Sequence, residues 1–171
     1  LVQSLLVATG RTGLHRRLGL VAAFVLAIMV PLGYAATITM VRRGFDLSGD
    51  QQIVPNPPAG ALDPAGASVF SFGYLLTFTI LAVSAICFRR RPAIHKRLML
   101  FANIELMGAP IAHLMGHFVL LTPASIIIPF SLFLLAAVVR DYLAEKRVYP
   151  LTACLAIVLF ISQPIDATVI G

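Results

Sequence analysis

The segment from Arg89 to Leu121 constrains the fold more than any other part of the chain. It opens with five basic residues and continues as an apolar run from Leu98 to Leu121. About 20 helical residues, at 1.5 Å each, cross the hydrocarbon layer of a bilayer. The run therefore predicts a membrane-spanning helix.

The composition extends this prediction to the whole chain. Of the 171 residues, 59% are hydrophobic and 12% charged, and the mean hydropathy is +0.94. Soluble domains carry about 25% charged residues. We therefore predict an integral membrane protein with one membrane domain over residues 1–171. Because the first residue is leucine, we expect the chain to begin inside a longer sequence.

Apolar runs separated by polar segments divide the chain into spans. We predict an all-α, polytopic transmembrane bundle with antiparallel neighbours, because the connections between most runs are short. The long exception is residues 44–67, which are rich in proline and aspartate and are predicted to form an outer loop. The predicted spans cover about residues 18–41, 69–88, 98–121, 124–139 and 150–166.

Basic residues are distributed unevenly around these spans. Eleven of the 13 fall on one side of the predicted membrane, and only Arg42 and Arg43 fall on the other. Positive residues favour the cytoplasmic side, so we predict a multi-pass protein with its basic connections in the cytoplasm. The positive charge is then explained by topology and some contact with anionic lipid, and we predict no nucleic-acid partner.

Two basic segments repeat a pattern. RTGLHRRLGL at residues 11–20 matches RPAIHKRLML at residues 91–100, and each precedes or opens a predicted span. A duplicated two-helix hairpin would produce this echo. His15 and His95 could contact a headgroup or quinone or relay protons, but histidine more commonly anchors a helix end together with lysine and arginine. The predicted interfacial basic collars contain Arg11, His15, Arg16, Arg17, Arg89, Arg90, Arg91, His95, Lys96 and Arg97.

His113 and His117 lie four residues apart in the central run, so they share one helical face. They are candidate ligands for haem b or contacts for a quinone, whereas two histidines alone do not complete a metal site, and we predict none. Counting along the helices places them level with four polar residues of other spans, Tyr34, Thr37, Gln163 and Asp166. Such a cluster could equally be a hydrogen-bond network that fixes helix packing.

Glu105 is an acid inside the same run. It could carry protons, or it could be a buried acid kept neutral by desolvation. Small residues on its predicted face, such as Gly108 and Gly116, would let another helix approach closely.

Motifs of familiar enzymes are absent from the sequence: it has no nucleophile elbow, Walker loop, dinucleotide fingerprint, HExxH or CxxCH. Cys87 and Cys154 fit no metal-ligand spacing and are expected to stay reduced. An enzyme is therefore not the leading expectation.

The HRRLGL and HKRLML segments, and more loosely RVYPLTACLAIVLFISQP, resemble sequences of uncharacterised bacterial polytopic membrane proteins. These belong to domain-of-unknown-function families with H-[RK]-R-L-M collars, of which one group looks similar to haem-copper oxidase assembly factors. The resemblance implies a helical inner-membrane bundle near bioenergetic complexes. It assigns no ligand role to His113 or His117.

Three functions follow as expectations. The first is a non-enzymatic accessory or assembly subunit of a larger membrane complex, whose partners are the lipid bilayer and other membrane subunits. The second is a small electron-transfer protein that binds haem b or a quinone. The third is a proton-coupled transporter with Glu105 as its carrier.

Overall fold

The computed structural model describes residues 6–43, 64–111, 114 and 123–168. Every long element in these ranges is a helix, so the all-α prediction is confirmed for this part of the chain. The long helices are α2 (Thr12–Arg43), α3 (Pro64–Cys87), α4 (Pro92–Glu105), α6 (Pro123–Glu145) and α7 (Pro150–Thr168).

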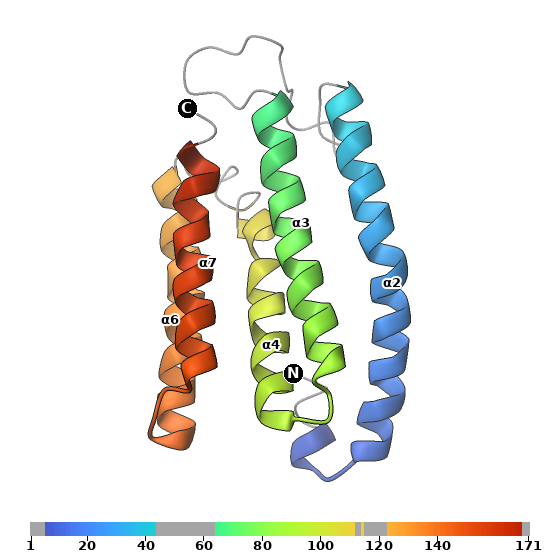
Figure 1. Cartoon of the computed structure of the whole chain (residues 1–171), viewed down its shortest axis with the longest axis vertical. Coiled ribbons are helices and arrows are strands. Elements are labelled where there is room, and N and C mark those ends of the chain that lie inside the picture. Colours follow the sequence, from blue (N-terminus) through green and yellow to red (C-terminus); the bar gives the residue numbers. More distant parts are fainter. Residues whose placement is uncertain (1–5, 44–63, 112–113, 115–122, 169–171) are drawn as a thin grey trace.

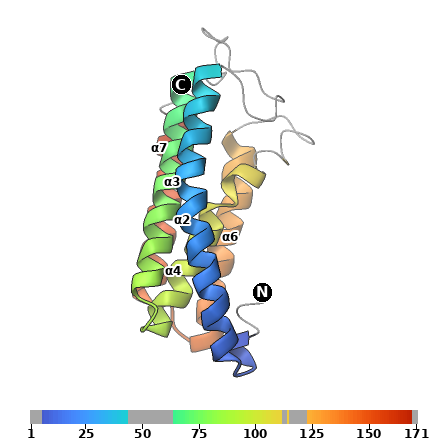
Figure 2. The ribbon, with the colours of Figure 1, turned by 90° about the vertical axis from the view of Figure 1, so that its right-hand side faces the viewer.

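The long helices lie side by side along one axis, and successive helices run in opposite directions (Figure 1). Helix α3 packs against both α2 and α4, and the α6–α7 hairpin packs against α4 (Figure 2). Helices α2, α4 and α7 begin at the same end of the bundle, where α3 and α6 finish. We call this the basic end, because the basic connections lie there.

Proline begins four of these helices, at Pro64, Pro92, Pro123 and Pro150. The first residue of a helix has no partner for its N–H, so proline is tolerated there and its fixed φ suits the first turn. The prediction that Pro150 starts a helix is confirmed.

The predicted helix over residues 98–121 is interrupted in the described part. Helix α4 ends at Glu105, Leu106 and Met107 form a turn, and helical bonding resumes where Ile111 N donates to Met107 O at 2.9 Å. Pro110 accounts for the break, because it has no N–H to donate to the carbonyl oxygen of Leu106 and its ring clashes with that carbonyl group.

Two other boundaries differ from the prediction. Residues 64–67, placed in the outer loop, form the start of α3, whereas residues 44–63 lie outside the described part. Helix α6 continues to Glu145, past its predicted end at residue 139. Its buried residues Phe130, Leu134, Ala137 and Asp141 follow helical spacing, so the buried stripe extends into the segment that was predicted to be a polar connection.

The core lies between α3, α4, α6 and α7, which all contribute buried apolar side chains. Phe101 of α4, Phe130 of α6 and Leu159 of α7 are its largest fully buried apolar side chains. Helix α2 is different, since its substantial contacts are with α3 and most of its apolar side chains, such as Leu20 and Phe24, are exposed. Two described helices, Thr12–Arg42 and Ile127–Glu145, are long and apolar enough to cross a membrane.

Gly108, in the chain after α4, lies against Tyr74 of α3. A Cβ there would lie 2.9 Å from Tyr74 Cε1 and 3.1 Å from Cζ. We expect Gly108→Ala to lower the free energy of unfolding by about 1 kcal/mol, because overpacking outweighs the gain in helix propensity. Gly19→Ala is the control, since nothing lies within 4 Å of its added Cβ. Equal stability of the two variants in reversible unfolding would contradict this packing.

Candidate functional site

Arg97 lies at the centre of a buried polar cluster at the basic end. Its side chain, on the second turn of α4, is only 2% exposed. Asp141 from α6 and Thr152 from α7 are buried beside it. We define the Arg97 cluster as Lys96, Arg97, Asp141, Glu145, Tyr149 and Thr152.

The guanidinium of Arg97 binds Asp141 in a bidentate manner. Nε donates to Oδ2 at 3.1 Å and Nη2 donates to Oδ1 at 2.7 Å. Nη2 also lies 2.9 Å from Glu145 Oε1, and the Tyr149 ring centroid is 4.1 Å from the Arg97 Cζ atom. Charge-assisted, bidentate bonds are among the strongest hydrogen bonds in proteins, and stacking on an aromatic face adds to them.

Asp141 accepts two further hydrogen bonds, one from Thr152 of α7 and one from Tyr149 just before that helix. Thr152 Oγ1 donates to Oδ2 at 2.6 Å, and the backbone N of Tyr149 donates to the same oxygen at 3.2 Å. Arg97 Nε also lies 3.1 Å from Thr152 Oγ1. The carboxylate therefore ties α4, α6 and the turn before α7 to one another.

Most hydrogen-bonding groups of the Arg97 cluster are already engaged within the bundle. Arg97 Nη1 donates to Ala93 O at 2.7 Å, so Nε and both terminal nitrogens of the guanidinium are engaged. A catalytic acid or base must reach a proton of its substrate, and neither Arg97 nor Asp141 is exposed enough to do so. The arrangement is suited to holding helices together.

The outer edge of the cluster is weaker. Lys96 Nζ lies 2.7 Å from Glu145 Oε1, but the two side chains are 45% and 28% exposed. Exposed ion pairs contribute about 0–1 kcal/mol to stability. Removal of one partner of the buried Arg97–Asp141 pair is therefore expected to cost more stability than removal of Lys96.

Arg97 is buried inside the bundle, unlike the other arginines of the predicted interfacial collar. The other predicted collar arginines are exposed, namely Arg11, Arg16, Arg17, Arg89, Arg90 and Arg91. Arg17 occupies the position in the first copy of the repeat that Arg97 occupies in the second. The two copies thus begin helices at the same end, but their arginines lie in different environments.

His15 and His95, the repeated histidines, are both half-buried. His95 Nδ1 lies 2.7 Å from Ala85 O on α3. A carbonyl oxygen only accepts, so Nδ1 carries the hydrogen and donates it. This bond joins α4 to the preceding helix.

The predicted polar cluster of the outer half is only partly within the described residues. Tyr34 stacks on Phe72 of α3, with ring centroids 5.6 Å apart, and Thr37 Oγ1 donates to Gly33 O of its own helix at 3.0 Å. Gln163 and Asp166 lie on α7, whereas His113 and His117 fall outside the described part. A haem or quinone site here stays a prediction. No group of three potential metal ligands occurs among the described residues.

Glu105 is buried at the last residue of α4, next to the helix break. The small residue predicted to allow close approach, Gly108, does lie against Tyr74 of α3. A role for Glu105 in proton transfer stays a prediction.

Asp141, Glu145, Tyr149 and Thr152 were not among the predicted site residues. One signal in the sequence points to the first two. Asp141 and Glu145 continue the three- and four-residue spacing of the apolar stripe of α6, which predicts that the acids face the same side as Ala137. The pairing with Arg97 required the tertiary arrangement.

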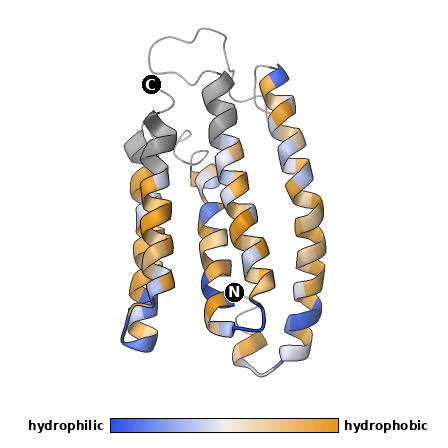
Figure 3. Ribbon diagram, viewed as in Figure 1, coloured by the Kyte–Doolittle hydropathy of each residue, from blue (hydrophilic) through white to orange (hydrophobic). Residues whose placement is uncertain are grey.

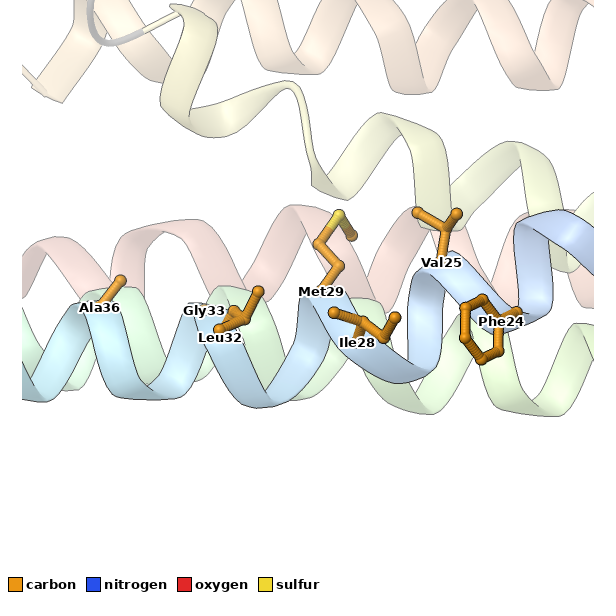
Figure 4. A pocket seen from close by; sticks show the side chains of 7 residues that line it. All are labelled: Phe24, Val25, Ile28, Met29, Leu32, Gly33 and Ala36. Atoms are coloured by element: carbon orange, nitrogen blue, oxygen red, sulfur yellow. The ribbon is translucent and has the colours of Figure 1, made fainter.

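A shallow surface pocket lies on α2. Its lining is apolar and comes from that helix alone (Figure 4): Phe24, Val25, Ile28, Met29, Leu32, Gly33 and Ala36. Binding sites for polar ligands need a few placed polar groups in addition to apolar walls. The pocket therefore resembles a surface for lipid or helix contact more than a substrate site.

Comparison with protein-family models, with curated proteins and with solved structures gives no match for this chain.

Proposed function

We propose that this chain is a multi-pass inner-membrane protein that serves as a non-enzymatic accessory or assembly subunit of a larger membrane complex. In this proposal the five predicted spans cross the bilayer, and the basic end faces the cytoplasm.

The observation that carries the proposal is the contrast between the interior and the exterior of the bundle. Inside, the buried charged and polar groups of the Arg97 cluster bind one another and hold the helices. Outside, large apolar side chains are exposed along α2, α3, α6 and α7. Polar groups committed to structure and apolar groups directed outward support a scaffold that packs against lipid and other subunits.

Purification from native membranes in a mild detergent, followed by native mass spectrometry, tests the proposal. We expect the chain to be extracted only with detergent and to co-purify with one larger membrane complex at a fixed stoichiometry. Isolation as a single subunit without such a complex would contradict the accessory role.

Two further measurements on the purified chain test the electron-transfer and transport functions. A stoichiometric haem or quinone in the mass spectrum, with haem bands in a reduced-minus-oxidised spectrum in the first case, would replace the proposal with electron transfer. Substrate flux in proteoliposomes that is lost on Glu105→Gln would replace it with proton-coupled transport.

A further inference from the structure

We propose that the basic end is a binding surface for the headgroups of anionic phospholipids. This inference rests on the proposed membrane location. It adds a specific partner, a negatively charged leaflet, and a set of residues that bind it.

The first support is the gathering of exposed cations. Three chain reversals, before α2, between α3 and α4 and between α6 and α7, bring distant parts of the sequence to one end (Figures 1 and 3). Nine basic side chains there are exposed and take part in no ion pair within the described residues: Arg11, Arg16, Arg17, Arg89, Arg90, Arg91, Arg140, Lys146 and Arg147.

The second support is that the acids near this surface are already engaged. Asp141 is buried against Arg97, and Glu145 contacts both Arg97 and Lys96. Neither is available to neutralise the nine exposed cations. The surface therefore attracts anions supplied from outside the described bundle.

The third support distinguishes a lipid from other polyanions. Exposed apolar side chains directly adjoin the cations: Leu14 and Leu18 flank Arg16 and Arg17, and Phe88 precedes Arg89. Exposed apolar side chains also lie close in sequence to the cations of α6 and of the connection between α6 and α7. Tyr142 and Leu143 follow Arg140, and Val148 follows Arg147. Cations beside apolar groups match the boundary between headgroups and acyl chains, whereas a nucleic acid would leave these apolar groups in water.

Lipid retention by the whole chain in nanodiscs tests the inference. The protein is inserted into nanodiscs with equal amounts of phosphatidylglycerol and phosphatidylcholine, and the lipids that stay bound after release are counted by native mass spectrometry. We expect the wild-type chain to retain mainly phosphatidylglycerol. Replacing Arg89, Arg90 and Arg91 with glutamine is expected to lower this preference about tenfold or more, since each cation near an anionic surface contributes separately.

Two controls keep the result specific. Lysine at the same three positions preserves the charge and should preserve the preference. Arg16→Gln with Arg17→Gln should weaken it, whereas Arg42→Gln with Arg43→Gln, at the other end of the same helix, should not. Circular dichroism confirms that each variant keeps its helices.

The inference is overturned if the wild-type chain retains both lipids equally, or if the Arg89–Arg91 variant keeps the wild-type preference. It is also overturned if the solubilised chain binds a DNA oligonucleotide while it shows no lipid preference. Failure of the chain to enter nanodiscs at all would be a different result, because it would contradict the proposed membrane location itself.

Discussion

Replacement of Arg97 by methionine is expected to lower the free energy of unfolding by about 3–5 kcal/mol. The side chain is 2% exposed and binds Asp141 through two hydrogen bonds. Methionine fills a similar volume but leaves the buried carboxylate of Asp141 without its counter-charge. The loss is therefore an electrostatic one, with little contribution from packing.

Arg17→Met is the matched control for this substitution. Arg17 occupies the equivalent place in the repeated segment but is exposed, so its replacement should change stability by less than about 0.5 kcal/mol. Reversible unfolding in mixed micelles measures both variants. Equal stabilities would show that Arg97 does not hold α4 against the α6–α7 hairpin.

A double variant separates charge pairing from other effects. Arg97→Met together with Asp141→Leu removes both members of the buried pair, and buried pairs replaced by apolar residues are often neutral in stability. We expect the double variant to be more stable than Arg97→Met alone. Additive losses from the two substitutions would contradict a direct coupling between these residues.

The helical class could be predicted from the sequence because apolar runs bounded by polar segments carry that information locally. Proline positions add helix starts, as at Pro150. The break after Glu105 could also be predicted, because the ring of Pro110 clashes with the carbonyl of Leu106 in a continuous helix. The apolar run continues past this break, so its length alone predicts one uninterrupted helix.

The Arg97 cluster could not be predicted in the same way. Basic residues at a helix start suit an exposed collar regardless of context, and Arg17 and Arg97 lie in similar local sequences, HRRLGL and HKRLML. What separates them is the neighbourhood: α4 packs against α6 and α7, whereas the substantial contacts of α2 are with α3. Asp141 and Thr152 lie 44 and 55 residues from Arg97 in the chain, so only the tertiary arrangement shows their contact.

Accessibility of one introduced cysteine should give an all-or-none result for the orientation of the bundle. The starting variant has both native cysteines, Cys87 and Cys154, replaced by serine. Arg90→Cys is then added at the exposed turn between α3 and α4, and Gln52→Cys, in the predicted outer loop, serves as the control. Intact cells are treated with a maleimide that cannot cross the membrane.

The proposed topology predicts that Gln52→Cys is labelled in intact cells, and that Arg90→Cys is labelled only after the membrane is permeabilised. Labelling of Arg90→Cys in intact cells, or recovery of the chain in the soluble fraction without detergent, would contradict the claim that this is a membrane bundle with its basic end in the cytoplasm.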